Sequence, residues 1–542
     1  MKKNTQQILQ YMKSNWSLLL FAVVVLYAPF FFAFSAANLD ATYRVCINAI
    51  YVVAASVVLL VTQNKLRKCV MIILVLLSFV PNVIVQSFLI MDNTIMKSTD
   101  FFVVFNTNPA EASGLFSSMP PNVLIWGIVY VSLIVFASLL CRWTSKNCEV
   151  PLWIQVITLV LFAGMSLMLP FRSKVPMVDF YKSFYKYNKE KIEVQQFYES
   201  RKNLDLDVEN LLSEGKKTFV VVIGESQNRQ HMQLYGYGRE TNPLLAEIRN
   251  ELAVYADVCS PSIQTLPVLK QILTFSNYQH PDMYKQEASI IEILKSAGYK
   301  TYWFDNQGGA KNKAWAIDSY TPTSYRTIAS MSDVFVVEEG KKDSVLFHYL
   351  DEALKDTAMY KVIFLHISGN HFKYNTRYEQ TFEVFTDTLG MESPFKSQLS
   401  KQQLDDLNAY DNATRYNDYV VRTFIEKLRE QEGMTSLIYF SDHGEEVYDY
   451  YAKSGRSFET ISPAMCEVPL IFWQNEMYKQ EHRLVINEQA PICTDDIIYA
   501  MMDMMGVRYA LYDSCLSFFT ERYISKERYV KGVKYIEIRN NF

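Results

Sequence analysis

Long apolar runs near the start of this chain constrain its fold more than any other feature of the sequence. Five of them fall within the first 171 residues and carry almost no charged side chains, unlike the helices of a soluble core. A helix needs roughly 20 apolar residues to cross a hydrocarbon layer of about 30 Å. The predicted spans are Trp16–Phe34, Val45–Val61, Val70–Ile90, Val123–Leu140 and Leu152–Leu169. We therefore expect a bundle of five transmembrane helices over residues 1–171, and no cleaved signal peptide.

Lysine and arginine gather in alternate loops between these runs. Lys2 precedes the first span, Lys65 lies between the second and third, and Arg142 lies between the fourth and fifth. Positively charged loops tend to stay in the cytoplasm, so the N-terminus is predicted to be cytoplasmic. Five spans then put everything after Phe171 on the outer side, although Arg172 runs against the rule.

The segment 172–217 separates the apolar part from the rest and is rich in Lys, Glu, Tyr and Phe. Two interpretations stay open: an amphipathic stretch that lies on the membrane surface, or a solvated helical linker. The pattern changes again at Thr218, so we predict three parts: the transmembrane domain 1–171, the bridging linker 172–217 and a globular domain 218–542.

Short β-branched runs alternate with helix-like segments from Thr218 onward. The predicted strands are Thr218–Ile223, Thr301–Phe304, Lys361–Leu365, Ser436–Phe440 and Pro469–Trp473, and the predicted helices include Ser289–Ala297 and Asp405–Gln431. This alternation is typical of an α/β domain with a mostly parallel central sheet flanked by helices. In such sheets ligands bind at the carboxyl ends of the strands.

Polar side chains stand where two of these predicted strands end. Glu225 follows the first strand, and Asp442 and His443 follow the fourth. Carboxylate and imidazole groups suit a divalent, zinc-like ion, and the absence of any C-x-x-C pair argues against a thiolate zinc site. Helix caps and surface side chains are the alternatives. The following Glu445 and Glu446 are candidates to support the ligands, but they are expected to be solvated.

Two hydroxyl groups are candidates for a nucleophile. Thr265 fits an N-cap, and Pro267 fits the first turn of the helix that follows. The hydroxyl would then lie at the positive end of a helix, where an anion is favoured, and a bound metal ion would activate it. A plain helix cap is the alternative, and Ser262 is a rival nucleophile.

Other polar residues follow two further strands. His371, in the loop after the third long strand, is a candidate to protonate a leaving oxygen or to bind a phosphoryl group. His366, closer to that strand, is expected to be structural. Asn306 is a candidate to hydrogen-bond a substrate.

Several motifs together resemble the bacterial phosphoethanolamine transferases, and within them the group that modifies the lipopolysaccharide core. They are Gly224–Ser226, Leu234–Pro243, Tyr410–Ala413, Ser441–Glu446 and, between the third and fourth spans, Asn106–Glu111. The resemblance covers most of the chain. It implies an alkaline-phosphatase/sulfatase-like fold for residues 218–542, and a multi-pass protein of the bacterial inner membrane whose catalytic domain lies in the periplasm.

The same resemblance implies the chemistry of the site. Glu225, Thr265, Asp442 and His443 would bind zinc, with Thr265 as the nucleophile and His371 at the substrate phosphate. Family members that modify lipid A usually carry another histidine after the Asp-His-Gly-Glu turn, and this chain has none before residue 482. One zinc site is therefore expected rather than two.

The implied reaction moves phosphoethanolamine from phosphatidylethanolamine to lipopolysaccharide, on the core or on lipid A, through a covalent phosphoethanolamine–enzyme intermediate. Thr107, Asn108 and Glu111 are candidates to hold the donor headgroup, with simple loop structure as the alternative. A phosphoglycerol transferase, a membrane-bound phosphodiesterase and a non-catalytic membrane sensor stay open. The net charge of −4 argues against a nucleic-acid partner.

Overall fold

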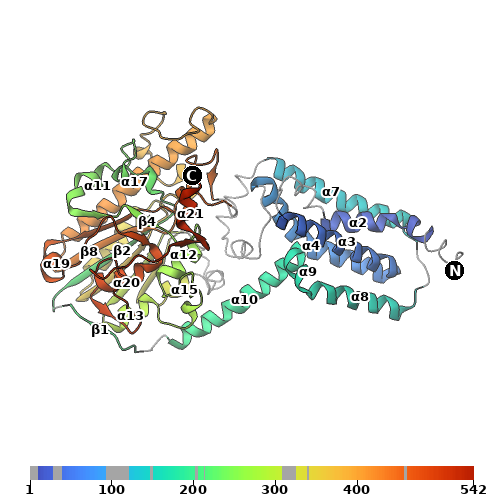
Figure 1. The fold of residues 1–542 in the computed structure, drawn as a ribbon, viewed down its shortest axis with the longest axis horizontal. Helices are drawn as coiled ribbons and strands as arrows, with labels where there is room; N and C mark the ends of the chain where they lie inside the picture. Colours follow the sequence, from blue (N-terminus) through green and yellow to red (C-terminus); the bar gives the residue numbers. More distant parts are fainter. Residues whose placement is uncertain are drawn as a thin grey trace. The chain divides into compact units, whose positions relative to one another are not determined.

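The chain folds into two compact units, Met1–Lys189 and Glu190–Phe542. The computed structural model describes residues 10–27, 39–92, 121–146, 150–201, 205–212, 214–307, 325–338, 341–456 and 460–542. The boundary between the units falls inside α10 (Pro176–Arg201), a 26-residue helix within the segment for which the sequence predicts a linker (Figure 1).

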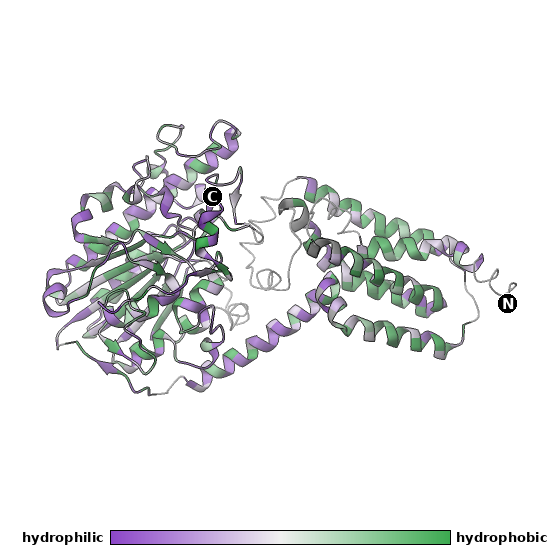
Figure 2. Cartoon of the chain, in the orientation of Figure 1, coloured by the Kyte–Doolittle hydropathy of each residue, from purple (hydrophilic) through white to green (hydrophobic). Residues whose placement is uncertain are grey.

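The first unit is a group of apolar helices, coloured as hydrophobic in Figure 2. They are α2 (Trp16–Tyr27), α3 (Leu39–Val61), α4 (Asn64–Asp92), α7 (Pro121–Thr144) and α8 (Leu152–Leu167). Within the described residues, α3, α4 and α7 contain stretches long and apolar enough to cross a membrane. With 12 and 16 residues, α2 and α8 are shorter than that. The described part of each predicted run is almost entirely helical, but the count of five spans is not confirmed.

Helix α2 lies at the centre of this unit, where Phe21 and Val25 are fully buried. The carbonyl of Val25 accepts hydrogen bonds from Asn82 Nδ2 (2.6 Å) and Tyr130 Oη (3.1 Å), so these polar groups are satisfied inside the apolar bundle. Outward side chains are exposed instead, for example Ile128 on α7 (69%) and Leu161 on α8 (68%). An apolar outer surface of this kind suits contact with lipid.

The second unit is built on a seven-stranded sheet in the order β3-β11-β8-β2-β7-β5-β6. The strands are β2 (Lys217–Gly224), β3 (Leu252–Val254), β5 (Lys300–Asp305), β6 (Val334–Val337), β7 (Tyr360–His366), β8 (Met434–Ser441) and β11 (Leu470–Gln474). The five predicted strands are confirmed. The sheet is mixed, however, because β11 runs antiparallel to both of its neighbours.

Alternate side chains of β2 point to opposite faces of the sheet and enter two different cores. Both faces are therefore covered by helices. Val221 and Ile223 pack with α12 (Thr265–Ile272), α13 (Ile290–Ser296) and α20 (Ile497–Met504). Val220 and Val222 pack with α16 (Val345–Lys355) and α17 (Lys401–Arg429). Helix α17 begins four residues before its predicted start, where Ser400 forms a capping box with Gln403.

The register of the central strands brings their carboxyl ends to one edge. Gly224 pairs with Ser441 across β2 and β8, and Ile223 pairs with His366 across β2 and β7. The residues that follow these three strands are therefore neighbours, although they are far apart in sequence.

Candidate metal centre

The first ligand candidate, Glu225, lies in a tight turn after β2. The turn requires a positive φ of 56° at Ser226, an unusual conformation for a residue other than glycine. Two contacts hold it: Ser226 N–H donates to Asp442 Oδ1 (3.2 Å), and Tyr410 Oη donates to the Ser226 carbonyl (2.6 Å). The Glu225 side chain is thereby fixed beside the end of β8 with only 1% of its surface exposed.

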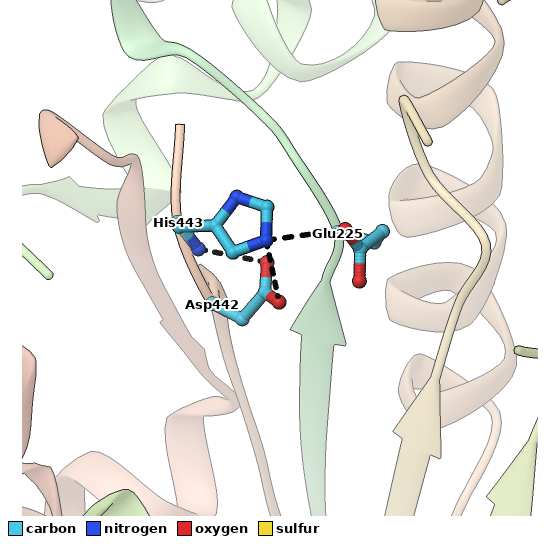
Figure 3. A group of neighbouring side chains, drawn as sticks. All are labelled: Glu225, Asp442 and His443. Carbon is cyan, nitrogen blue, oxygen red and sulfur yellow. Dashed lines mark hydrogen bonds and ion pairs between the residues drawn. The ribbon is translucent and has the colours of Figure 1, made fainter. Parts of the chain in front are cut away.

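The other two candidates follow β8. The His443 ring donates from Nδ1 to the Gly444 carbonyl (2.9 Å), which leaves the lone pair of Nε2 available. That nitrogen lies 3.3 Å from Glu225 Oε1 and 3.3 Å from Asp442 Oδ2 (Figure 3). Gly444 is required for the close packing of this turn, because a Cβ there would lie 2.1 Å from the Ala464 carbonyl oxygen.

These three side chains form a set that fits a divalent cation. One ligand atom from each lies within 4.8 Å of the others, and all three residues are buried. Asp442 Oδ2 is buried and accepts no hydrogen bond from the described residues. Burial and the neighbouring Glu225 carboxylate raise the pKa of Asp442 well above its ordinary value. A bound cation would remove both penalties, since it offsets the repulsion and coordinates the unused oxygen.

Thr265 contacts this set directly. Its Oγ1 lies 3.1 Å from Glu225 Oε2 and 3.2 Å from His443 Nε2. The predicted cap is wrong by one residue, because Gln264 is the N-cap and Thr265 is the first residue of α12. Ser262 is buried, and no contact of its hydroxyl with the three ligand candidates occurs among the described residues. The structure thus brings Thr265, and not Ser262, to the centre.

His371 reaches the same region on the loop after β7. Asn370 N–H donates to the Glu225 carbonyl (2.9 Å), and Gly369 permits this approach with a φ of 47°, since a Cβ would lie 2.8 Å from that oxygen. Arg377 Nη2 lies 3.1 Å from His371 Nδ1. Burial lowers the pKa of His371, Glu225 opposes this shift and Arg377 adds to it, and together they bring the pKa to about 4. The ring is therefore neutral, with its proton on Nε2.

The side chain of Asn306 is engaged by neighbours other than the ligand candidates. The Asn306 amide donates to the Lys341 carbonyl and to Asp343 Oδ1, both at 2.7 Å, so its side chain braces the neighbouring loop. His366 is fully buried, in keeping with a structural role. Thr107, Asn108 and Glu111 lie outside the described residues.

The structure corrects one expectation and adds one residue. Glu445 and Glu446 are buried, not solvated, with 2% and 0% of their surfaces exposed. Arg456 pairs with Glu445 through Nε (3.2 Å), and its Nη1 contacts the His443 ring. No motif singles out Arg456, because it follows a short hairpin and depends on this buried ion pair for its position.

The remaining motifs of the globular part support the site without contributing ligands. Tyr410 holds the turn after Glu225. Beside it, Asp411 accepts from Arg239 Nη1 (2.7 Å) and Tyr237 Oη (2.9 Å) and pairs with His231 Nδ1 (2.7 Å). The Leu234–Pro243 and Tyr410–Ala413 motifs therefore meet in one buried ionic network.

Comparisons with known proteins agree with this architecture. A family model described as Sulfatase matches residues 217–507. The phosphoethanolamine transferase EptC of Escherichia coli is 32% identical over 324 residues, which are 58% of this chain and 55% of that relative. The chain thus spans about half the length of this relative.

Solved structures give the same picture. The C-terminal periplasmic domain of EptC from Escherichia coli, in complex with Zn, is 29% identical with a TM-score of 0.55, covering 60% of this chain and 92% of that one. The integral membrane protein EptA from Neisseria meningitidis is 18% identical with a TM-score of 0.64, covering 93% and 98%, which shows a shared fold.

Proposed function

This chain belongs to the sulfatase family, and from that premise we propose that it is a phosphotransferase that moves phosphoethanolamine from a phospholipid to a lipopolysaccharide. The activity named for its relative EptC, phosphoethanolamine transfer, supports the transferred group. One structural observation carries the proposal: a hydroxyl at the start of a helix touches a buried set of two carboxylates and one imidazole.

Glu225, Asp442 and His443 would hold one zinc ion, with the Thr265 hydroxyl as a further ligand. When bound, such an ion lowers the pKa of a coordinated hydroxyl and stabilises negative charge on phosphoryl oxygens. The chain itself orients the nucleophile, because Thr265 Oγ1 donates its hydrogen to Glu225 Oε2. The lone pairs of Oγ1 therefore point away from this carboxylate.

In the first proposed step, Thr265 Oγ1 gives its proton to Glu225 Oε2 and attacks the phosphorus of phosphatidylethanolamine. The bond to the glycerol oxygen breaks, and this oxygen takes a proton from water as diacylglycerol leaves. Phosphoethanolamine is then esterified to Thr265. In the second step an acceptor hydroxyl or phosphate of lipopolysaccharide attacks the same phosphorus and frees Thr265. His371, with its proton on Nε2, donates a hydrogen bond to a phosphoryl or leaving oxygen.

The apolar helices of the first unit fit this assignment, because donor and acceptor are both lipids. We place the chain in a bacterial inner membrane as a multi-pass protein, with a cytoplasmic N-terminus and a periplasmic catalytic domain. Thr107, Asn108 and Glu111 stay candidates for holding the donor headgroup.

The direct test is expression in a lipopolysaccharide-bearing host that lacks its own phosphoethanolamine transferases, followed by mass spectrometry of the glycolipid. The wild-type chain is expected to add the mass of phosphoethanolamine, and the Thr265→Ala variant is not. Added phosphoglycerol, or lipid cleavage without transfer, would replace the proposal with one of the alternative enzymes. An unchanged glycolipid would refute it.

A further inference from the structure

Arg456 is a cation held against the candidate metal centre, and the reaction above gives it no part. It follows β10 (Ser454–Gly455), and its side chain is 24% exposed. Its Nη1 donates to the Ile263 carbonyl (3.3 Å) and contacts Nε2 of His443, the nitrogen that faces the two carboxylates. The Nη end of this guanidinium therefore lies at the ligand set itself.

The opposite edge of the guanidinium is anchored. Arg456 Nε lies 3.2 Å from Oε2 of Glu445, a residue with only 2% of its surface exposed. The other oxygen of that carboxylate accepts a hydrogen bond from Tyr374 Oη (3.2 Å), which fixes its orientation. The ion pair with Glu445 thus engages Nε and not the Nη groups.

The charges at the site leave the negative charge of a bound phosphoryl group for a guanidinium such as that of Arg456 to balance. A divalent ion would balance the two carboxylates, Glu225 and Asp442, and a phosphoryl group would then bring negative charge of its own. Arg377, the guanidinium beside His371, donates to the carbonyls of His371 (3.0 Å) and Phe372 (2.9 Å) and contacts His371 Nδ1. Arg456 carries its charge at the ligands, and a planar guanidinium binds two phosphoryl oxygens at once.

Arg456 and a metal ion cannot both use Nε2 of His443. That nitrogen has a single lone pair, so it either contacts Nη1 or coordinates the ion. Occupation by a metal ion would displace the Nη end of Arg456, while the Nε–Glu445 contact lies outside the ligand set and can persist.

We propose that Arg456 is a substrate-binding residue that leaves His443 when a divalent ion binds and then holds the phosphoryl oxygens of the substrate from its anchor on Glu445. This inference rests on the proposed function for the phosphoryl chemistry of the substrate. Arg456 would thus compete with the metal ion for His443 and also bind the anion.

Two binding measurements on the full-length protein in detergent micelles test this role. Zinc alone is titrated into metal-free protein, and O-phosphoethanolamine is then titrated into zinc-loaded protein. In Arg456→Ala, zinc should bind more tightly, because a competing cation is gone. O-phosphoethanolamine should bind about ten- to a hundredfold more weakly, as expected for a lost charged hydrogen bond.

Arg508→Ala is the matched control. Arg508 also pairs with one carboxylate, Asp503 (2.7 Å), and its side chain is 30% exposed, but neither residue contacts the site described above. Both affinities should stay at the wild-type value in this variant. In Glu445→Gln the anchor is weakened, and the loss of O-phosphoethanolamine affinity should be smaller than in Arg456→Ala.

Two results would overturn the inference. If Arg456→Ala binds O-phosphoethanolamine as tightly as the wild type, the side chain does not hold the anion. If its zinc affinity falls together with its anion affinity, Arg456 only maintains the fold of the site. Failure of the proposed function would give a different result. The wild-type protein would bind zinc and then O-phosphoethanolamine, and would still transfer nothing to lipopolysaccharide.

Discussion

Thr265 is the residue on which the proposed chemistry depends, because its hydroxyl alone among the candidate nucleophiles contacts the ligand set. Removing it in Thr265→Ala should reduce transfer by at least about a thousandfold, as loss of a covalent nucleophile does. Thr265→Ser keeps an oxygen at the same position and should retain part of the activity.

Ser262→Ala is the control for this comparison, because Ser262 is buried three residues earlier and no hydrogen bond joins its hydroxyl to the ligand set in the part of the chain that the structure describes. Its transfer rate, measured with purified protein and labelled phosphatidylethanolamine, should match the wild type. Transfer that survives in Thr265→Ala and disappears in Ser262→Ala would reverse the assignment of the nucleophile.

The raised pKa of Asp442 predicts the pH dependence of metal binding. Burial and Glu225 favour the protonated acid, whereas coordination requires the carboxylate, so zinc must displace a proton. Zinc affinity should therefore rise with pH, by up to about tenfold per pH unit for one proton released, until the Asp442 carboxyl group is fully ionised. Competition with a fluorescent chelator measures this, and an affinity that falls as pH rises would contradict the assignment of Asp442 as a ligand.

At the scale of secondary-structure elements, the central strands β2, β8 and β11 could be predicted from sequence because each contains a continuous apolar run of four or five residues. Two shorter strands, β3 and β6, have three and four residues and give too little pattern to be recognised. The reversed direction of β11 was also missed, because strand direction depends on how the connecting segments pack and not on the composition of the strand.

Sequence patterns are local, and this also explains which parts of the site could be predicted. Glu225, Asp442 and His443 each follow a recognisable strand directly, so the sheet edge brings them together. Glu445 and Arg456 depend on a long-range ion pair that no local pattern encodes. Only the tertiary structure shows that Glu445 is buried.

An ion pair joins His231, which precedes α11 (Pro243–Glu247), to Asp411 on α17. It predicts a pH-dependent contribution to stability. Burial alone would lower the pKa of His231, but Asp449 and Asp411 raise it from 6.5 to about 10. Its charged form therefore stabilises the fold fully below about pH 6.5, and this contribution is lost as pH rises toward 10.

Replacing His231 with Gln should lower stability by about 3 kcal/mol at pH 6, as expected when a buried ion pair is broken, and by less at pH 9.5. Thermal unfolding of the full chain in detergent, followed by tryptophan fluorescence, measures the difference from wild type. His280→Gln changes an exposed histidine and should have no effect at either pH. A deficit for His231→Gln that grows with pH would contradict the role of the charged ring.

At the scale of the whole molecule, the unit Glu190–Phe542 contains the complete ligand set and both cores of the sheet. Expressed alone, it should fold and bind zinc with wild-type affinity. Transfer from phosphatidylethanolamine in vesicles should fall strongly, since the apolar helices proposed to keep the enzyme at its lipid substrates are missing. Calorimetry and vesicle assays measure the two properties, and an isolated unit that fails to bind zinc would show that the first unit contributes to the centre.

The adjacency of β2 and β8 also fixes the order of events during synthesis. Glu225 leaves the ribosome more than 200 residues before Asp442 and His443, yet the two central strands must pair before any ion can be captured. A nascent chain that has emerged only as far as β7 holds one carboxylate and no partner for it. The proposed metal loading is consequently a late event in the maturation of this protein, and metal cannot serve as a nucleus for its folding.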